Sequence, residues 1–448
     1  MSFFHLAAVV LAAGKGTRMR SDLPKVLHRI AGKPLLAHVL DSLAELSPDQ
    51  TVVVAGPNMP GVAAAAQPHP VAIQTEQLGT GHAVAAARAA LGDVTADTVL
   101  VVYGDTPLLT PDTLRGLVAA RRAHDAAVVV LGMRPEDPGA YGRLILDHTG
   151  MLEAIVEAAD ATPEQLAIGL CNSGVMAIAG AHLWNLIDRI EPNPAKGEYY
   201  LTDIVALARA QGLAVRAVEA PADQLAGVNS RADLAAAEAI LQQRLRLRAM
   251  EEGATLRDPA TIYLSADTIL GRDVVIGQNV VIGPGVSIGD RVEIKPFCHL
   301  EGVTIAADAV IGPYARLRPG SVIGEGAHIG NFVELKNAVM AAGSKANHLT
   351  YLGDCSVGAG SNIGAGTITC NYDGFAKHRT TIGANVFVGS DTAFVAPVTI
   401  GDGAITAAGS VITEDLPADA LGLGRARQVT KPGQASRFRA SRSSGGKG

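Results

Sequence analysis

The second half of the chain carries an aliphatic residue, often followed by Gly, at every sixth position. The pattern runs from about Leu270 to Val411 and includes Ile276-Gly277, Ile282-Gly283 and Ile288-Gly289 in a row. A period of six does not fit one face of a helix, which has about 3.6 residues per turn. It is typical of a parallel β-helix, in which each hexapeptide gives a short strand and a turn and stacks one apolar side chain on the coil below.

Two departures from this period lie next to polar segments. It holds from Ile305 to Leu335 but is then lost, because the next matching residue, Leu352, stands 17 positions further on. Ile363 and Ile382 are 19 positions apart, which is also out of phase. We therefore predict interruptions of the stack after Leu335 and at residues 370–377, the latter as a protruding loop, where polar residues are free for chemistry.

The first half alternates hydrophobic runs with helical patterns. Strands are expected at 6–11, 52–55, 99–102 and 127–131, and helices at 34–46, 83–91 and 111–123. This order predicts an α/β fold with a doubly wound, Rossmann-like parallel sheet. Ligands bind at the carboxyl ends of the strands in such sheets, so the loops that follow the strands are the places to search.

A chain of 448 residues exceeds the size at which one hydrophobic core keeps growing. We expect a nucleotide-binding domain at 1–229, a linker helix at 230–252, a hexapeptide-repeat domain at 253–428 and a disordered basic tail at 429–448. Ser230 is a good N-cap for the linker helix, and Gly253 is suited to end it.

Composition narrows the class of protein. Aromatic residues make up only 4% of the chain, so the core must be built from Ala, Val, Leu and Ile. The net charge of -6 argues against a nucleic-acid partner, although the basic tail leaves a tether to nucleic acid or membrane as an alternative. The four cysteines are scattered and indicate a cytoplasmic protein with reduced thiols. The apolar run at 3–13 lacks a preceding basic stretch and is expected to be a buried strand, and no stretch approaches the ~20 apolar residues that span a bilayer.

The loop after the first strand has the composition of a phosphate cradle. It reads Gly14-Lys15-Gly16-Thr17-Arg18, and Lys25 adds a cation downstream. Glycines let backbone N–H groups approach an anion, and the basic side chains supply positive charge. The alternatives are a plain tight turn with solvated charges and, for Lys25, a surface lysine.

Two further loops carry candidate ligands. Asp105 ends Tyr103-Gly104-Asp105 after the third strand, where a carboxylate either holds Mg²⁺ beside phosphates or caps the following turn. Gln74 to Gly81 precede a helix, so that Gln side chains could read the edge of a base, or Thr80 could simply cap the helix.

His348 stands beside the first lapse of the hexad with basic and aromatic neighbours. A neutral imidazole has a pKa of about 6.5 and can take a proton from an attacking amine. The alternative is a histidine that only makes structural hydrogen bonds.

Several motifs together resemble one family. They are Leu11-Ala12-Ala13-Gly14-Lys15-Gly16-Thr17-Arg18-Met19, Pro24-Lys25, Gln77-Leu78-Gly79-Thr80, Tyr103-Gly104-Asp105, Tyr141-Gly142-Arg143, Glu157, Asn172-Ser173-Gly174, Gly197 to Asp203, Gly227-Val228-Asn229 and Ala346 to Asp354. With the hexapeptide half attached, the chain from about residue 5 to about residue 428 resembles the bacterial bifunctional N-acetylglucosamine-1-phosphate uridyltransferases / glucosamine-1-phosphate acetyltransferases.

The resemblance implies a first site that joins UTP to N-acetylglucosamine-1-phosphate and releases pyrophosphate. Arg18 and Lys25 would be catalytic by neutralising the triphosphate, and Asp105 and Asn229 would bind Mg²⁺. The implied nucleotide and sugar contacts are Leu11, Ala12, Ala13, Gly14, Lys25, Gln74, Gly79, Thr80, Tyr103, Gly104, Asp105, Gly142, Glu157, Asn172 and Asn229.

The resemblance also implies a second site that acetylates glucosamine-1-phosphate from acetyl-CoA, with His348 as general base. The implied contacts are Arg318, Lys336 and Tyr351 for the sugar phosphate, Asn362 and Asn371 for the sugar, and Ala365, Tyr372, Ser390, Ala408 and Arg425 for acetyl-CoA. Family members carry a small residue where this chain has Asn347. The resemblance further implies a left-handed β-helix, a homotrimer with shared active sites, and a role in supplying peptidoglycan and lipopolysaccharide precursors.

A protein of another class remains to be weighed, namely a monofunctional nucleotidyltransferase whose β-helix serves only for oligomerisation. Such an inert prism has no need of His348 beside Lys336, or of the loop that begins at Asn371.

Overall fold

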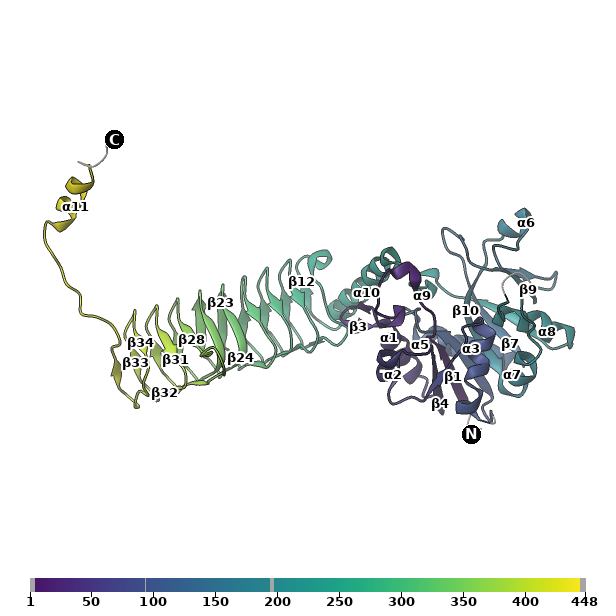
Figure 1. The fold of residues 1–448 in the computed structure, drawn as a ribbon, viewed down its shortest axis with the longest axis horizontal. Helices are drawn as coiled ribbons and strands as arrows, with labels where there is room; N and C mark the ends of the chain where they lie inside the picture. Colours follow the sequence, from purple (N-terminus) through teal and green to yellow (C-terminus); the bar gives the residue numbers. More distant parts are fainter. Residues whose placement is uncertain (1–4, 93, 194–196, 444–448) are drawn as a thin grey trace. The chain divides into compact units, whose positions relative to one another are not determined.

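The computed structural model describes residues 5–92, 94–193 and 197–443, and the start of the apolar run at 3–13 and the end of the tail at 429–448 lie outside these ranges. The chain divides into two compact units, Met1–Leu245 and Arg246–Gly448. Figure 1 shows helices around a sheet in the first unit and a stack of coils in the second. Each unit is described by itself below.

The first unit is built on a twisted sheet with the strand order β11-β7-β10-β6-β1-β4-β5, to which the hairpin β8-β9 is attached. The strands are β1 (Leu6–Leu11), β4 (Gln50–Ala55), β5 (Val71–Ile73), β6 (Thr98–Tyr103), β7 (Val128–Met133), β8 (Arg143–Leu146), β9 (Leu152–Val156), β10 (Cys171–Ala179) and β11 (Val215–Glu219), and a separate two-stranded pair is β2 (Arg29–Ile30) with β3 (Lys33–Pro34). The expected doubly wound architecture is confirmed, with β1 between β4 and β6 and parallel to both.

The sequence predicts a parallel sheet, but the sheet of the first unit is mixed. Strand β10 runs antiparallel to both of its neighbours, β6 and β7. Between β7 and β10 the chain forms the β8-β9 hairpin and the short helix α6 (Pro163–Leu166), and it re-enters the sheet at the carboxyl end of β7.

Helices cover both faces of this sheet. They are α1 (Leu35–Ala44), α2 (Pro60–Ala66), α3 (Thr80–Ala86), α4 (Arg88–Leu91), α5 (Pro111–Ala123), α6 (Pro163–Leu166), α7 (Gly180–Ile187), α8 (Ile204–Ala210) and α9 (Ala222–Leu225). Side chains that alternate along β1 enter different cores, since Val9 packs in one cluster and Val10 in the other. The single helix expected at 83–91 is two shorter helices, α3 and α4, and it begins earlier, at Thr80.

Helix α10 (Arg231–Glu251) occupies the expected linker and crosses the boundary between the two units. The Ser230 hydroxyl accepts a hydrogen bond from Asp233 N at 3.2 Å, as an N-cap does, and Gly253 follows the helix with a positive φ of 103°. Leu234 and Ile240 pack against a small core of the first unit, whereas Leu247 is 53% exposed.

The second unit is a parallel β-helix, as the hexad pattern predicts. Its first strands are β12 (Thr255–Leu256), β13 (Ile269–Leu270), β14 (Val275–Ile276), β15 (Val281–Ile282), β16 (Ser287–Ile288), β17 (Glu293–Ile294), β18 (His299–Leu300), β19 (Val303–Ile305), β20 (Val310–Ile311), β21 (Arg316–Leu317), β22 (Ser321–Ile323) and β23 (His328–Asn331). They continue as β24 (Glu334–Met340), β25 (Lys345–His348), β26 (Tyr351–Val357), β27 (Asn362–Ile363), β28 (Ile368–Cys370), β29 (Thr380–Ile382), β30 (Phe387–Val388), β31 (Ala393–Val395), β32 (Val398–Ile400), β33 (Ile405–Thr406), β34 (Val411–Ile412) and β35 (Leu421–Gly422). Every strand pair between them is parallel, and the repeating aliphatic residues are buried, which is consistent with the left-handed β-helix expected.

Only one of the two predicted interruptions is real. Leu335 and Leu352 pair directly in the β24–β26 ladder, so the stack continues without a gap. A coil with one residue fewer in a turn changes the hexad phase and leaves the register intact, and Ile294 and Ile311, also 17 positions apart, pair in the same way. The second interruption is confirmed as a loop, because Cys370 ends β28, β29 starts only at Thr380, and the intervening residues leave the stack.

The basic tail was expected to be disordered. The structure has helix α11 (Gln434–Ser443) there, and residues 425–442 are all exposed. Ala and Arg are strong helix formers, which accounts for local helix without packing.

Candidate active sites

A cavity of about 380 Å³ opens at the carboxyl ends of β1 and β6. Most of the residues expected to hold the nucleotide line it, namely Leu11, Ala12, Ala13, Gly14, Lys25, Gln74, Gly79, Thr80, Tyr103, Asp105 and Asn229. Lys15, Val26, Gln77, Ala83 and Glu198 also line it but were not predicted as contacts. Of these, Lys15, Gln77 and Glu198 lie in the motifs already named, whereas Val26 and Ala83 lie outside them.

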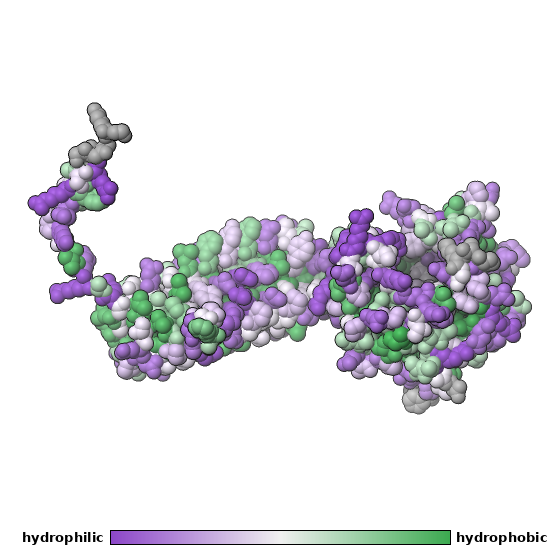
Figure 2. Space-filling view, viewed as in Figure 1, coloured by the Kyte–Doolittle hydropathy of each residue, from purple (hydrophilic) through white to green (hydrophobic). Residues whose placement is uncertain are grey.

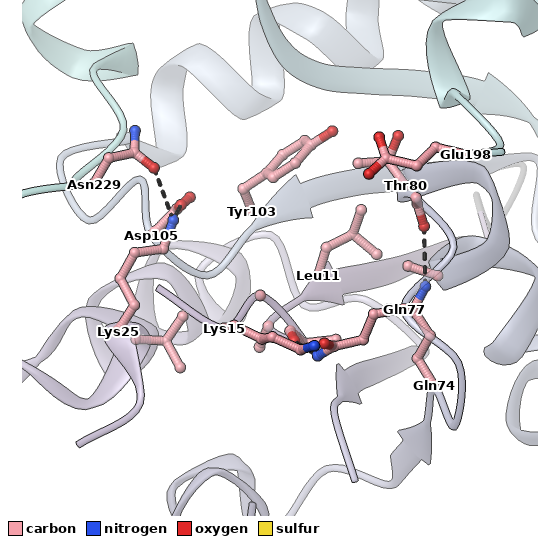
Figure 3. A pocket seen from close by; sticks show the side chains of 16 residues that line it. Leu11, Lys15, Lys25, Gln74, Gln77, Thr80, Tyr103, Asp105, Glu198 and Asn229 are labelled. Atoms are coloured by element: carbon pink, nitrogen blue, oxygen red, sulfur yellow. Dashed lines mark hydrogen bonds and ion pairs between the residues drawn. The ribbon is translucent and has the colours of Figure 1, made fainter. Parts of the chain in front are cut away.

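One end of the cavity gathers a cation and two oxygen ligands (Figure 3). Lys25 Nζ donates a hydrogen bond to the Asp105 carboxylate and another, at 3.0 Å, to Asn229 Oδ1. The Lys25 and Asp105 side chains are only 13% and 15% exposed. The Asp105 and Asn229 oxygens thus both contact the Lys25 ammonium. The turn after β6, which carries Asp105, is stabilised by Thr106, whose hydroxyl donates to Tyr103 O at 2.8 Å.

Asp105 and Asn229 come from distant parts of the chain, and the backbone brings them together. Val228 N donates to Asp105 O at 2.9 Å, which ties the start of α10 to the end of β6. One carboxylate and one amide oxygen suit a hard cation that keeps its other positions for water and phosphate. Among the described residues there is no group of three or more His, Cys, Asp or Glu side chains that could hold a metal ion.

The opposite end of the cavity is formed by the loop before α3. Gln74, which is 4% exposed, donates from Nε2 to Gly79 O at 3.0 Å, and Gln77 donates to Ala13 O. Gly79 has a φ of 100°, and a Cβ there would come within 2.6 Å of Tyr199 O, so only glycine fits. Gly79 is the N-cap of α3, and the alternative of a cap at Thr80 is wrong, because the Thr80 hydroxyl accepts instead from Leu201 N at 3.0 Å.

Gly142, Glu157 and Asn172, expected to hold the sugar, form a separate group next to this cavity. Asn172 N donates to Gly142 O at 2.8 Å, and a Cβ on Gly142 would lie 3.6 Å from Glu157 Oε2. Tyr103 joins this group to the cavity. Burial raises the pKa of the Tyr103 phenol, and the Asp105 and Glu157 carboxylates raise it further, so the hydroxyl stays protonated.

Two other predicted residues do not line the cavity. Arg18 is exposed on the short 3-10 helix Thr17–Met19. Gly104 packs inward, where a Cβ would lie 3.2 Å from a Val26 methyl. Lys15 and Lys25 therefore line the cavity, whereas Arg18 lies at the surface.

His348 lies at the end of β25 on the surface of the β-helix. Its Nδ1 is 2.7 Å from Asn331 Oδ1, in the neighbouring coil, and β23 and β25 pair Asn331 with His348 directly. An amide oxygen only accepts, so this hydrogen bond places the ring proton on Nδ1 and leaves the lone pair of Nε2 free to take a proton. Next to His348, Asn347 Oδ1 is buried without a hydrogen-bond partner.

Arg318, Lys336 and Lys377 form a group of positively charged side chains further along these coils. Arg318 N donates to Leu335 O at 2.9 Å, so Arg318 stands beside Lys336. The Lys377 ammonium, from the protruding loop, lowers the pKa of Lys336. Lys377 was not predicted as a site residue, although it ends the loop that the sequence analysis singled out.

The Asp354 carboxylate anchors this cationic group. Burial acts to raise the pKa of Asp354, but hydrogen bonds from Asn337 at 2.8 Å and Asn371 at 2.5 Å hold it below its ordinary value. Tyr351 lies alongside, since a Cβ on Gly353 would meet both its hydroxyl and the Asn371 amide. Arg318, Lys336, Tyr351 and Asn371 are therefore brought together as expected.

The residues expected to contact acetyl-CoA occupy equivalent turns of successive coils. Asp391 N donates to Ala365 O at 2.7 Å, Gly409 N donates to Ser390 O at 2.8 Å, and Gly409 lies against Arg425. Gly366 N donates to Leu349 O at 3.1 Å, which places the turn after His348 at the head of the same line. We call the line His348, Ala365, Ser390, Ala408 and Arg425 the corner column. Asn362 lies beside it, paired with Lys345, and Tyr372 lies in the loop, where its hydroxyl donates to Gly374 O at 2.6 Å.

Two rows of exposed hydrophobic residues flank the corner column. Phe387, Ile405 and Leu421 stack through the β30–β33–β35 ladder and are 53%, 45% and 60% exposed. Ile368 and Val411, on the strands after the corner, are 47% and 51% exposed. Figure 2 shows hydrophobic surface over these last coils of the β-helix. We call Phe387, Ile405 and Leu421 the apolar row.

None of the helices in the described ranges combines the length and the hydrophobicity that a membrane crossing requires. All four cysteines are free, and three of them are buried.

Known proteins resemble the chain in both halves. The family model of the MobA-like NTP transferase domain matches residues 8–195, and the model of the bacterial transferase hexapeptide matches residues 267–302, 302–337 and 379–414. The hexapeptide matches leave out residues 338–378, which contain His348 and the protruding loop.

Relatives match over nearly the whole chain. A protein of Rhodospirillum rubrum is 61% identical over 97% of each chain, one of Acidiphilium cryptum is 59% identical over 97% of this chain and 98% of its own, and one of Paramagnetospirillum magneticum is 58% identical over 98% of each. Each of the three is named "Bifunctional protein GlmU".

Proposed function

The chain belongs to the bifunctional GlmU family, and from that premise we propose how its two sites divide the synthesis of UDP-N-acetylglucosamine. The enzyme acetylates glucosamine-1-phosphate and joins the product, N-acetylglucosamine-1-phosphate, to the uridylyl group of UTP. The observation that carries the proposal is the presence of two separate groups of polar side chains, one in each compact unit.

The first unit performs uridylyl transfer in the cavity at the carboxyl ends of β1 and β6. A phosphate oxygen of N-acetylglucosamine-1-phosphate attacks the α-phosphorus of UTP in line, and pyrophosphate leaves. Gly14 and Lys15 follow β1 and face the triphosphate, while Gln74 and Gly79 hold the base at the other end. No covalent intermediate is required, because positioning and charge neutralisation supply most of the rate in such reactions.

Asp105 and Asn229 are the residues that would hold Mg²⁺. When bound, Mg²⁺ neutralises charge on the phosphates. In support, their two oxygens already converge on one cationic group, the Lys25 ammonium. Lys25, at the same end of the cavity, is the cation that faces the phosphates. Arg18, exposed on the same loop, adds its charge from outside the cavity.

Gly142, Glu157 and Asn172 hold the N-acetylglucosamine moiety. This role is supported by the contacts among these residues and by their place next to Tyr103, which lines the cavity. We propose that the sugar lies on the Tyr103 side of the cavity.

The second unit performs acetyl transfer along the corner column. The amine of glucosamine-1-phosphate attacks the thioester carbon of acetyl-CoA, His348 Nε2 takes the amine proton, and the CoA thiolate leaves. Arg318 and Lys336 neutralise the sugar phosphate, and Lys377 is a third cation for it. Tyr351, Asn362 and Asn371 hold the sugar, whereas Ala365, Tyr372, Ser390, Ala408 and Arg425 follow the acetyl-CoA chain.

A homotrimer with shared acetyl-transfer sites is part of the same proposal. The corner column is open, and the apolar row beside it exposes three large side chains to water. Contiguous exposed apolar surface of this kind marks an interaction site, and a second copy of this chain would close the column from that side. A cytoplasmic location is also proposed, supported by four cysteines that are all unpaired.

Two assays on the wild-type enzyme test the two reactions. Acetyl-CoA consumption should require glucosamine-1-phosphate, and pyrophosphate release from UTP should require N-acetylglucosamine-1-phosphate and stop when EDTA removes the metal. Pyrophosphate release without any acetyl-CoA consumption would leave only the alternative of a nucleotidyltransferase with an inert prism.

A further inference from the structure

The Gln74 carboxamide is held in one orientation by two acceptors. Its Nε2 lies 3.0 Å from Gly79 O and 3.2 Å from Nδ1 of His82, in helix α3. A backbone carbonyl only accepts, so the nitrogen of the carboxamide, and not its oxygen, must face Gly79. The second hydrogen of that nitrogen is then directed to His82 Nδ1, which acts as acceptor and puts the ring proton on Nε2.

This arrangement leaves the Gln74 oxygen for a ligand. Both hydrogens of the amide nitrogen are engaged, and Oε1 has no partner among the described residues. Gln74 is 4% exposed yet lines the cavity, at the end away from Asp105 (Figure 3). The cavity therefore presents a fixed hydrogen-bond acceptor where the base is expected.

A fixed acceptor distinguishes between the two pyrimidines. The N3 atom of uracil carries a hydrogen that this oxygen can accept, whereas N3 of cytosine carries a lone pair and would face the oxygen without a hydrogen bond. A carboxamide that turned over would present its NH₂ group and favour cytosine instead. Selection of the base thus depends on what stops Gln74 from turning.

We propose that His82 is a positioning residue for nucleotide selection, and that its Nδ1 lone pair holds the Gln74 carboxamide with the oxygen toward the base. The inference rests on the proposed uridine site. His82 also has a packing contact, because its ring lies 6.2 Å from the Tyr199 ring at an angle of 34°. An experiment must therefore separate the acceptor from the ring.

Two substitutions make that separation. His82→Phe keeps a ring against Tyr199 but has no acceptor, whereas His82→Asn keeps an acceptor near the position of Nδ1 but has no ring. For each variant and the wild type, kcat and KM are measured with UTP and with CTP, and the dissociation constants of both nucleotides are measured without sugar phosphate.

His82→Phe should lower the preference for UTP over CTP by roughly 2–10-fold, the range that one hydrogen bond carries. The change should appear in KM and in the dissociation constants, with kcat nearly unchanged. His82→Asn should stay within about twofold of the wild type, because an amide oxygen can replace the imidazole nitrogen as acceptor.

The opposite result, wild-type selectivity in His82→Phe with loss in His82→Asn, would show that only packing matters and would overturn the proposal. Unchanged selectivity in both variants would overturn it as well. A wild type that binds CTP as well as UTP would instead refute the uridine site itself, and the role of His82 with it.

Discussion

The two candidate sites differ in how far one chain encloses them. In the first unit, Lys25, Asp105 and Gln74 are each less than about one-sixth exposed and surround a cavity. In the second unit His348 and Arg425 are exposed, and Tyr372 is 60% exposed. The first site is a pocket, and the second is a line of residues on a surface.

The difference follows from the two folds. In a doubly wound sheet the strand ends and the loops after them meet at one edge, so residues far apart in sequence surround a common space. In this β-helix the core is filled by the stacked aliphatic residues and small Ser and Thr side chains, and the charged side chains of the described coils stand on the outside. A site on a β-helix therefore needs a second wall, and the apolar row next to the corner column is where we propose a second copy supplies it. The following predictions test whether the two sites are independent and whether only the second depends on assembly.

The largest expected effect is that of His348→Ala on acetyl transfer. Loss of a general base typically costs about 10²–10⁴-fold in rate, and His348 Nε2 is the lone pair that the hydrogen bond to Asn331 leaves free. Acetyl-CoA consumption with glucosamine-1-phosphate measures the loss, and uridylyl transfer should be unchanged. His299→Ala, which removes an exposed histidine from strand β18 of the same β-helix, is the matched control and should retain both activities.

Asp105→Ala should have the reverse pattern. Removal of one preorganised charge from an active site costs about 10²–10³-fold, here in uridylyl transfer, while acetyl transfer is spared. Asp105→Asn keeps an acceptor for Lys25 and should give a similar loss in a more stable fold, because Ala leaves a mostly buried ammonium without its partner. Pyrophosphate release measures the effect, and Asp112→Ala, at a side chain that is 92% exposed, serves as control. Loss of both activities in a folded Asp105 variant would contradict independent sites.

The first site could be predicted from sequence further than the second. The loops after β1 and β6 can be recognised in the sequence by glycines and charged residues that follow predicted strands. Gln74, Asp105 and Lys25 all line the cavity as expected. Glu198 belongs to the motif Gly197 to Asp203, but its place in the cavity wall could not be predicted, because that motif lies far along the chain from the loops after β1 and β6. The antiparallel strand β10 was missed for a similar reason, since a buried hydrophobic run does not reveal its direction.

In the second unit, the six-residue pattern predicts the coils of the β-helix, but it does not predict which departures from the pattern interrupt the stack. The change of phase after Leu335 is a shorter turn within a continuous stack, and only the later lapse adds a loop. His348 is singled out in the sequence by its place beside the first lapse and by its basic and aromatic neighbours, but in the structure it stands on a regular strand and not at a break. Lys377 reaches Lys336 only through the folded loop, a contact that spacing in the sequence does not predict.

Ile405→Glu tests the role proposed for the apolar row. A carboxylate at this half-exposed position should be tolerated by the isolated chain but not by an apolar interface, where its desolvation is costly. We expect a smaller particle in sedimentation or light scattering and a fall of at least about tenfold in acetyl transfer, with uridylyl transfer retained. The matched control is Ile269→Glu, which makes the same change at an isoleucine that is 64% exposed on strand β13, outside the apolar row. If Ile405→Glu dissociates the assembly and leaves acetyl transfer intact, the second site is complete within one chain, and the contrast between the two sites disappears.

Asn331→Ala should have the smallest effect and tests how the open site holds its base. Asn331 Oδ1 accepts from His348 Nδ1 at 2.7 Å, which fixes both the tautomer and the direction of the ring on a surface where little else restrains it. Without that acceptor, part of the population carries the proton on Nε2, and kcat for acetyl transfer should fall by roughly 2–10-fold, as expected for one neutral hydrogen bond. KM should change less, because the cations that hold the sugar phosphate are untouched. Asn331→Asp keeps an acceptor at the same position and should restore most of the rate, which a role in packing alone would not predict. If Asn331→Ala has full activity, the neighbouring copy, and not this coil, must orient His348, and that outcome would make the second site still more dependent on assembly than the first.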